Sequence, residues 1–256
     1  MTFDEFDAKM RVFETASDIC VLPEMFFVAR LDGRSFTRLT KNVLKFEAPY
    51  DIRFRDLMVL TAKSLMHDGF NVRYGYIQSD EISLLFSPTE TQFKRKLRKF
   101  NSVLAAEASA RFTLDAGQVA AFDCRVSQLP NLDLVSDYFR WRSADALRNS
   151  LNSHCYWAMR KSGATSKQAT RRLIGLSISS KHDLLHEEFG INFKTLPNWQ
   201  KRGVGLYWEQ YFKTAENPVT GEMKTATRRR VKVDFELPVK NEYSEMIKQL
   251  VRLSLC

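Results

Sequence analysis

Three acidic residues at the ends of predicted strands are the side chains best placed for chemistry. Asp32 ends the apolar run MFFVARLDG at 25–33, and Asp80 and Glu81 follow the extended segment NVRYGYIQ at 71–78. Carboxylates that meet at one edge of a sheet repel one another, so such a cluster favours a bound cation. Oxygen ligands suit Mg²⁺, and two such ions stabilise the attacking and leaving oxygens of a phosphoryl transfer. The alternative, aspartates that serve only in turns, fits the pattern equally well.

The elements that must position these acids alternate between strands and helices in the first half of the chain. The apolar patterns predict a strand at 25–33, a helix from Asp51 through His67, strands at 71–78 and 81–87, a basic helix at 91–113 and a strand at 118–127. Only Ser79 and Asp80 separate the second strand from the third, which predicts a β-hairpin. The order βαββαβ indicates an α+β fold, in which an antiparallel or mixed sheet carries helices on one face.

The second half is predicted to be mainly helical, with a β-hairpin near its end. The predicted elements are helices at 133–161, 166–174 and 180–188, and strands within 203–237 around the turn N-P-V-T-G-E at 217–222. No Pro/Gly-rich linker separates the two halves. We therefore expect regions 1–130 and 131–256 to pack together as a single compact unit.

The composition is that of a basic globular protein. The 256 residues carry 39 Lys and Arg against 30 Asp and Glu, a net charge of +9 that suits a polyanionic partner such as nucleic acid. No apolar run is long enough to cross a bilayer, and the acidic start MTFDEFDAKM lacks the apolar region of a signal peptide. The four cysteines are scattered, which argues against disulfides and zinc thiolates. The sequence therefore predicts a soluble, cytoplasmic protein with no membrane partner.

Seven segments resemble, in order, the motifs of the tRNA-histidine guanylyltransferase superfamily. The two that carry the acids are R-L-D-G-R-S-F at 30–36 and Q-S-D-E-I-S-L-L-F at 78–86. The others are F-E-A-P-Y-D (46–51), F-K-R-K-L-R-K (93–99), F-D-C-R-V (122–126), D-Y-F-R-W-R-S-A-D (137–145) and S-K-H-D-L-L-H-E-E-F-G-I-N (180–192). The resemblance covers about residues 25–210. It implies a polymerase-like palm over 1–130 and the addition of nucleotides to the 5′ end of tRNA in the 3′-to-5′ direction.

The same resemblance implies a set of site residues. Asp32 and Asp80 would bind two Mg²⁺ ions with the Gly33 carbonyl as a further ligand, and Glu81 would stand beside them as a third catalytic acid. ATP and GTP or another nucleoside triphosphate would be the substrates, held mainly through backbone N–H groups. The implied nucleotide-binding residues are Asp32, Gly33, Arg34, Ser35, Phe36, Thr37, Ser79 and Asp80.

The tRNA substrate would contact two further groups of residues. Those expected to bind phosphates at the 5′ end are Arg30, Lys96, Lys99 and Arg125. Those expected to contact tRNA elsewhere are Asp145, Asn149, Lys181 and His182. For the lysines the alternative is a solvated basic helix face. Because the family is often tetrameric, we also expect a homotetramer.

Two departures from the family pattern bear on substrate choice. Leu147 stands where the eukaryotic enzymes have a His that helps to recognise the tRNA-histidine anticodon, and Ala48 replaces a Lys that contacts nucleotide. Both losses favour the guanylyltransferase-like branch, which repairs 5′-truncated tRNA by template-dependent addition. The alternatives are a tRNA-histidine-specific guanylyltransferase, a nucleotidyl cyclase and a non-catalytic RNA-binding protein. A cyclase needs no basic RNA surface, and a non-catalytic protein has no physical reason to keep clustered acids.

Overall fold

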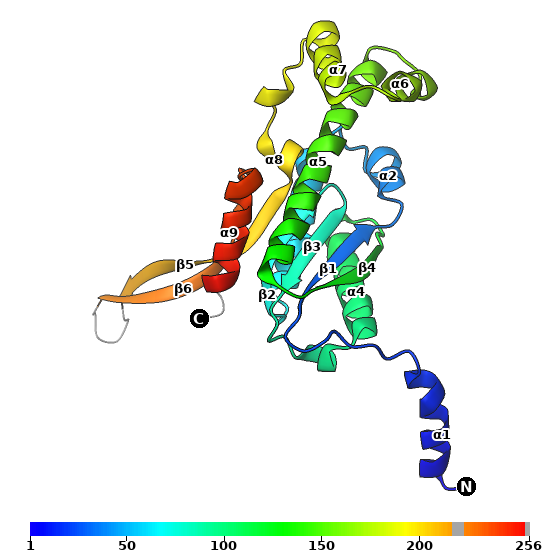
Figure 1. The fold of residues 1–256 in the computed structure, drawn as a ribbon, viewed down its shortest axis with the longest axis vertical. Coiled ribbons are helices and arrows are strands. Elements are labelled where there is room, and N and C mark those ends of the chain that lie inside the picture. The colour runs from blue at the N-terminus through cyan, green and yellow to red at the C-terminus, as the bar shows by residue number, and fades with distance from the viewer. Residues whose placement is uncertain (217–222, 254–256) are drawn as a thin grey trace.

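A six-stranded antiparallel sheet organises the computed structural model, which describes residues 1–216 and 223–253 (Figure 1). The strands lie in the order β4-β1-β3-β2-β5-β6, and every pairing among them is antiparallel. Their bounds are β1 Phe26–Gly33, β2 Val72–Gln78, β3 Glu81–Phe86, β4 Phe122–Leu129, β5 Val204–Glu216 and β6 Met223–Asp234. The predicted α+β class and the β2–β3 hairpin are therefore confirmed.

Helices cover both faces of the sheet. Their bounds are α1 Phe3–Thr15, α2 Phe36–Arg38, α3 Ile52–His67, α4 Leu97–Ala116, α5 Leu132–Lys161, α6 Ser166–Leu173, α7 Ile178–Asp183, α8 Asn198–Arg202 and α9 Lys240–Leu253. The two long helices of the first half, α3 and α4, lie on one face, as predicted from the βαββαβ order. The second half supplies α5 and α9, which cover the opposite face.

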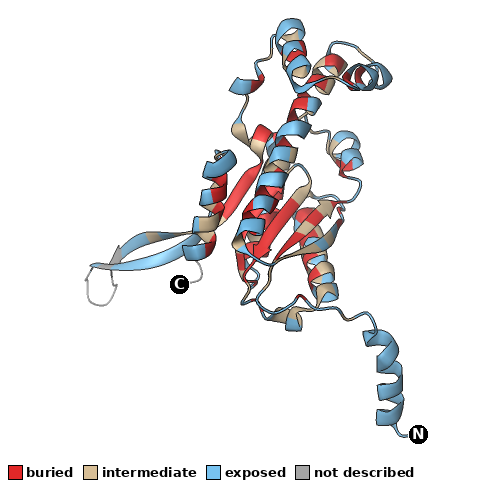
Figure 2. Ribbon diagram, viewed as in Figure 1, coloured by how far each residue is buried: buried red, intermediate tan, exposed pale blue. Residues whose placement is uncertain are grey.

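Strand β1 shows how the two layers divide its side chains. Successive residues of a strand point to opposite faces, so Phe27 and Leu31 pack in the core against α3 and α4. Val28 points the other way and packs beneath α5 with Phe139. On that second face the apolar pattern stops before the strand does, because Arg30 and Asp32 occupy its last positions. Figure 2 shows buried residues along the central strands and the inner faces of α5 and α9.

Side-chain caps begin the two helices that frame the site. Asp51 caps α3, and its carboxylate accepts a hydrogen bond from the backbone N–H of Arg53 at 2.8 Å. Asn131 caps α5 by accepting from the N–H of Leu134 at 2.9 Å. Such caps satisfy backbone donors that have no partner inside the helix. They explain why α3 and α5 begin close to their predicted positions.

Several predicted boundaries differ from the structure. The helix predicted from residue 91 begins as α4 only at Leu97, because Phe93, Lys94 and Arg95 have positive φ angles. The strand predicted from residue 118 begins at Phe122, because α4 continues to Ala116. Helices α1 and α9 were not predicted, and the predicted turn at 217–222 lies outside the described residues. In the part of the chain that the structure describes, no helix has the length and apolarity to cross a membrane.

Candidate active site

Strand register brings the predicted acids together at one end of the sheet. Asp32 at the end of β1 lies opposite Glu81 on β3 and opposite Asp123 on β4. Asp80 occupies the β2–β3 turn, and its carbonyl accepts a hydrogen bond from the Gly33 N–H at 3.0 Å. The end of β1 is thus tied to the turn that carries Asp80. Residues 48 positions apart in sequence therefore share one site, as the strand order predicted.

The carboxylate of Asp80 sits in an unfavourable environment. Burial, with the nearby charges of Asp32 and Glu81, raises the pKa of Asp80 to about 6. The guanidinium of Arg125 lies 3.8 Å from Asp32, but Arg125 is more than half exposed. A cluster whose negative charges are incompletely balanced by the protein is a site where a cation is stabilised.

Glu81 has a partner that motif comparison alone did not single out. Its carboxylate accepts a hydrogen bond from Arg142, a buried residue of α5. The same guanidinium lies 3.3 Å from the carboxylate of Asp145, which also accepts from Arg148 and Asn149. The sequence placed Arg142 within the motif at 137–145 and predicted Asp145 and Asn149 as site residues, but it gave no sign that Arg142 joins Asp145 to Glu81.

The arrangement suits a metal held by two carboxylates rather than three. Among the described residues, no three His, Cys, Asp or Glu side chains are arranged to hold a metal ion. Since Glu81 is engaged by Arg142, the candidate ligands are Asp32, Asp80 and the Gly33 carbonyl. Mg²⁺ commonly binds through one or two carboxylates and completes its shell with waters and substrate phosphates. The residues present therefore fit Mg²⁺.

The loop after β1 packs tightly beneath this site. Phe36 is 2% exposed and its ring lies among the rings of Phe112 and Phe122, with centroid distances of 5.0 and 4.9 Å. A Cβ on Gly33 would meet the Phe36 ring at 2.5 Å, so only glycine fits there. The side chain of Phe36 therefore belongs to the core, and this residue can offer a ligand only its backbone.

Not every predicted backbone donor in this loop is free. The N–H of Gly33 is bonded to Asp80, and the N–H of Arg34 donates to the Ala121 carbonyl at 2.8 Å. Ser35 follows with a φ of 61°, which turns the chain into α2. The amides at the start of α2 are the ones that a helix of this kind leaves for capping groups or ligands.

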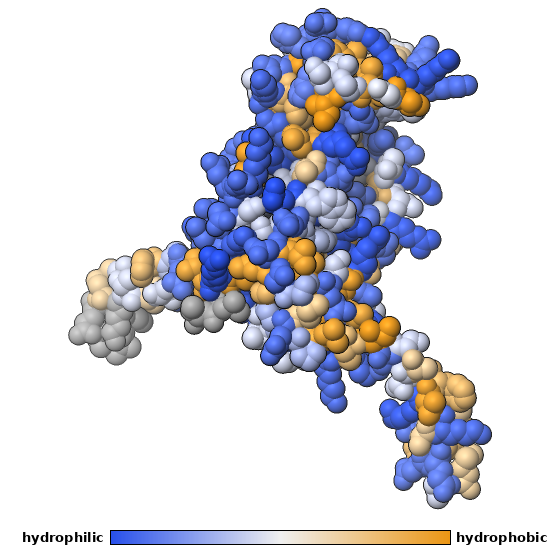
Figure 3. Space-filling view, in the orientation of Figure 1, coloured by the Kyte–Doolittle hydropathy of each residue, from blue (hydrophilic) through white to orange (hydrophobic). Residues whose placement is uncertain are grey.

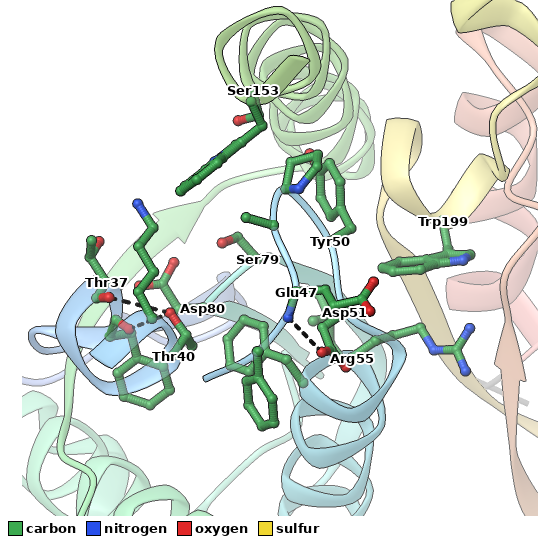
Figure 4. Close-up of a pocket in the computed structure, with 18 of the residues that line it drawn as sticks. Thr37, Thr40, Glu47, Tyr50, Asp51, Arg55, Ser79, Asp80, Ser153 and Trp199 are labelled. Carbon is green, nitrogen blue, oxygen red and sulfur yellow. Dashed lines mark hydrogen bonds between the residues drawn. The ribbon is translucent and has the colours of Figure 1, made fainter. Parts of the chain in front are cut away.

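A cavity of about 260 Å³ opens beside Asp80 (Figure 4). Its walls include Phe36, Thr37, Thr40, Lys41, Tyr50, Asp51, Arg55, Ser79, Asp80, Ser153, Trp157 and Trp199. In Figure 4, Thr37 and Asp80 lie on one side of this space, Tyr50 and Trp199 lie on another, and Ser153 approaches from α5. The lining thus includes four of the predicted nucleotide-binding residues, namely Phe36, Thr37, Ser79 and Asp80. The rest of the lining consists of aromatic and polar residues from distant segments.

Several of these lining residues were not predicted as site residues. Lys41 Nζ lies 4.8 Å from the ring centroid of Trp157, and the Arg55 guanidinium lies 5.0 Å from that of Trp199. Cation–π pairs of this kind hold a basic group over an aromatic face. Sequence offered little signal for them, because a single Lys or Trp on a helix is ordinarily a surface or packing residue.

Two family models cover nearly the whole chain. Residues 7–130 match the model described as tRNAHis guanylyltransferase, and residues 133–248 match the Thg1 C terminal domain. The chain is 32% identical over 240 residues to the probable tRNA(His) guanylyltransferase of Mus musculus, across 88% of this chain and 80% of that protein. The chain belongs to this family. It is therefore a nucleotidyltransferase of the kind that acts on tRNA 5′ ends.

Relatives with solved structures share the fold. A bacterial tRNA(His) guanylyltransferase (Thg1)-like protein in complex with ATP is 29% identical, with a TM-score of 0.77, and the match covers 96% of this chain and 98% of that one. The same kind of protein in complex with GTP is 28% identical, with a TM-score of 0.72, over 96% and 99% of the two chains. The tRNA(His) guanylyltransferase from Saccharomyces cerevisiae is 25% identical, with a TM-score of 0.69, and the match covers 77% of this chain and 91% of that one.

The basic residues expected at the tRNA 5′ end divide into two groups. Arg30 and Arg125 are register partners on β1 and β4, next to Asp32, so the structure places them at the acidic site. Lys96 instead pairs with Asp18, beside the start of β1, and Lys99 lies one turn further along α4. Because a strand rises about 3.3 Å per residue, the length of β1 places these lysines roughly 20 Å from Asp32. The structure does not bring the two groups together within one chain.

The residues expected to contact tRNA elsewhere lie on α5 and α7. Asp145 and Asn149 form one hydrogen-bonded pair on α5, at 3.1 Å. Lys181 and His182 line a cavity of about 420 Å³ that they share with Leu147. Leu147 is 45% exposed. An aliphatic side chain therefore occupies a surface position where the motif resemblance led us to expect a histidine in the eukaryotic enzymes.

Proposed function

We propose that the protein is a template-dependent 3′-to-5′ nucleotidyltransferase that repairs tRNA with a truncated 5′ end. The proposal rests first on Asp32 and Asp80, which lie at the same end of the sheet beside a cavity that suits a nucleotide. The choice of the repair branch rests on Leu147, whose exposed aliphatic side chain offers no hydrogen bond to an anticodon base. The similarity to bacterial guanylyltransferase-like proteins supports the same branch.

In this proposal two Mg²⁺ ions would be held by Asp32, Asp80 and the Gly33 carbonyl, in the cluster where burial and the neighbouring carboxylates raise the pKa of Asp80. Bound Mg²⁺ supplies neutralisation of phosphate charge during phosphoryl transfer. Glu81 contributes by holding Arg142, and so by fixing α5 over the sheet. Arg30 and Arg125 would add positive charge for the 5′ phosphate.

The incoming nucleotide would place its base in the cavity and its triphosphate along the loop after β1. The relatives bound to ATP and GTP support both nucleotides as substrates. The amides of Ser35, Phe36 and Thr37, at the first turn of α2, would serve as phosphate donors together with Ser79. The N–H groups of Gly33 and Arg34 already donate within the protein. These two residues and Asp32 would therefore position the loop rather than donate hydrogen bonds to the triphosphate.

The chemical step forms one phosphodiester bond and breaks one phosphoanhydride bond. The tRNA 5′ phosphate first carries a leaving group, either its own triphosphate or an adenylyl group from ATP. The 3′ hydroxyl of the incoming nucleotide attacks the activated α-phosphorus and expels pyrophosphate or AMP. The protein contributes positioning and charge neutralisation, which account for most catalysis of phosphoryl transfer.

The proposal includes the partners and organisation that the sequence suggested. The net charge of +9 supports tRNA as the polyanionic partner. Residues 1–130 would form the palm-like catalytic region, and residues 131–256 would supply helices and a β-hairpin packed on it. A homotetramer would be the working form, with Lys96 and Lys99 of one copy available to tRNA held by another.

The decisive experiment is nucleotide addition to a tRNA that lacks its 5′-terminal residue. Wild-type protein is incubated with Mg²⁺ and each labelled triphosphate, and the opposing base in the acceptor stem is varied. Addition that follows the opposing base, and that is lost in Asp80→Ala, supports the repair polymerase. Addition of G to intact tRNA-histidine alone would establish the specific guanylyltransferase instead. Absence of addition to any tRNA, by folded protein that still binds triphosphate, would exclude both.

A further inference from the structure

The N-terminal helix α1 is an isolated element. None of its 13 residues is buried, although a capping box between Thr2 and Glu5 defines its start. Figure 1 shows it projecting from the end of the molecule that lies opposite α6 and α7. A helix of this length, standing alone, is only marginally stable in water. A surface that covers one face of α1 would supply the stabilisation that the isolated helix lacks.

One face of α1 carries the side chains that such a surface would cover. Phe3, Phe6, Met10 and Phe13 follow the spacing of three and four residues that aligns side chains along a helix. They are 79%, 47%, 49% and 73% exposed. Figure 3 shows hydrophobic residues on the surface of this projecting helix. Four large apolar side chains in one stripe form the anchor pattern of a helix that docks into a groove.

The charge of α1 selects the class of partner. The helix carries four carboxylates against Lys9 and Arg11, whereas the whole chain has a net charge of +9. An acidic helix is repelled by nucleic acid and by anionic lipid, so neither is a suitable occupant. A basic protein surface attracts it. A second copy of this chain has a basic surface and is present wherever the first copy is.

The chain also contains a groove that matches the stripe. A cavity of about 550 Å³ lies between α5 and α9, and its lining includes Trp141, Leu147 and Val239. These three side chains are 56%, 45% and 39% exposed. The charged residues of the lining are Arg140, Arg202 and Lys240 against Asp137, which pairs with Arg140, so the groove keeps a positive excess. An apolar floor with a basic rim complements an acidic helix with an apolar stripe.

The attachment of α1 directs it to a second copy rather than to its own groove. Asp18 pairs with Lys96 and Arg98 at the start of α4, which fixes the chain at that point. Only Ala16 and Ser17 separate this anchor from the last residue of α1. From there α1 extends away from α5 and α9 (Figure 1).

We propose that α1 of one copy docks in the groove between α5 and α9 of a second copy. Phe6 and Met10 would enter the apolar floor around Trp141 and Leu147. The acidic residues of α1 would lie near Arg202 and Lys240. This contact does not involve Asp32, Asp80 or the cavity beside them, but it covers part of Leu147 and would form one interface of the homotetramer, so it rests on that part of the proposed function.

The first test compares two double variants of the full-length chain. Phe6→Glu with Met10→Glu places two charges on the stripe, whereas Ala8→Glu with Val12→Glu places two charges on the opposite face of the same helix. The molar mass of each protein is measured by light scattering over a range of concentrations. We expect the stripe variant to raise the dissociation constant for self-association at least tenfold, and the control to change it less than twofold. Equal masses for wild type and the stripe variant would overturn the proposal.

The second test locates the groove. A photoactivatable phenylalanine analogue replaces Phe6, and this protein is mixed with isotopically heavy chains before irradiation. Cross-links from light α1 to heavy peptides containing Trp141–Leu147 or Val239 support docking between copies. Cross-links within one chain, or between two α1 helices, would overturn it. A folded protein that gives no protein cross-link but cross-links to added tRNA would also overturn it.

Discussion

Arg142 of α5 donates a hydrogen bond to the carboxylate of Glu81, the first residue of β3. The two residues are 61 positions apart in sequence, and the Arg142 side chain is only 5% exposed. One guanidinium thus joins the end of the sheet that carries Asp32 and Glu81 to the helix that carries Asp145. Glu81 therefore has a structural partner that it must keep while the neighbouring acids act.

Removal of Arg142 is expected to be strongly destabilising. Arg142→Met leaves the partly buried Glu81 without the guanidinium that it accepts from, a change that typically costs about 3–5 kcal/mol, whereas Asp145 keeps Arg148 and Asn149. Arg148→Met is the matched control, because Arg148 also bonds Asp145 but is 73% exposed. An exposed pair of that kind contributes about 0–1 kcal/mol. The free energy of unfolding in urea measures both changes.

The double variant Glu81→Gln with Arg142→Met separates this pair from general packing effects. If the two side chains stabilise each other, their combined loss should fall short of the sum of the single losses by about 1–3 kcal/mol. Strict additivity of the two changes would show that the hydrogen bond contributes nothing beyond packing.

Asp80 is expected to lower the stability of the metal-free protein at neutral pH. Its folded-state pKa of about 6 lies above its ordinary value of 3.8, so the folded state binds more protons between these pH values. Stability therefore falls as pH rises through that window, and Asp80→Asn removes the loss. We expect this variant, in EDTA at pH 8, to be about 1–2 kcal/mol more stable than wild type, with little difference below pH 4.

The same variant tests the metal site. Mg²⁺ should raise the melting temperature of the wild-type protein and should have little effect on Asp80→Asn. Asp123→Asn is the control, because Asp123 also lies opposite Asp32 but its side chain is 64% exposed. A similar Mg²⁺ effect in the wild type and in Asp80→Asn would argue against Asp80 as a ligand.

His154 is expected to make the protein sensitive to acid. Burial lowers the pKa of His154 to about 4, below its ordinary value of 6.5. Between these two pH values the unfolded chain binds more protons than the folded one. The contribution of His154 to the free energy of unfolding is therefore complete above pH 6.5 and is lost as the pH falls toward 4. The ring lies 5.3 Å from Tyr50 and 5.9 Å from Phe193, so His154→Phe preserves the aromatic packing. Wild type should lose about 1–3 kcal/mol more than this variant between pH 6.5 and pH 4.

Gly33→Ala should destabilise the protein through one identifiable clash. The added Cβ would meet the Phe36 ring at 2.5 Å, and overpacking of a core costs about 1–3 kcal/mol. The same substitution in a Phe36→Ala background should cost markedly less, because the side-chain atoms of residue 36 that the new Cβ would meet are then absent. Thermal unfolding of the four proteins in this cycle measures the difference. A cost that does not depend on residue 36 would place the effect of Gly33→Ala in the backbone.

The palm's elements could be predicted because each satisfies a local pattern. β1 has apolar residues on both faces, Asp51 caps α3, and Ser79 with Asp80 is too short a connection for anything but a hairpin. Helix α1 was missed although the capping residues Thr2 and Glu5 and the helical spacing of its apolar residues are both present in the sequence. The shift of α4 to Leu97 was missed because it depends on positive φ angles at non-glycine residues.

The candidate site was only partly predictable for a similar reason. Asp32 and Asp80 end strands whose order follows from short connections, so their meeting could be inferred. The Arg142–Glu81 bond could not, because it depends on the rotation of α5 about its own axis over the sheet. The separation of Lys96 from the acids also escaped motif comparison, since a motif states residue types but not which end of a strand they approach.

The pairing of β2 with β5 has a consequence for biosynthesis. β2 lies between β3 and β5, and residues Tyr74–Ile77 pair with Val204–Tyr207. Before β5 has been synthesised, the backbone N–H and C=O groups on one side of β2 have no partner strand. An unpaired strand of this kind with apolar side chains promotes aggregation. A nascent chain that stops before residue 204 is therefore a substrate for chaperones rather than an independently folded palm.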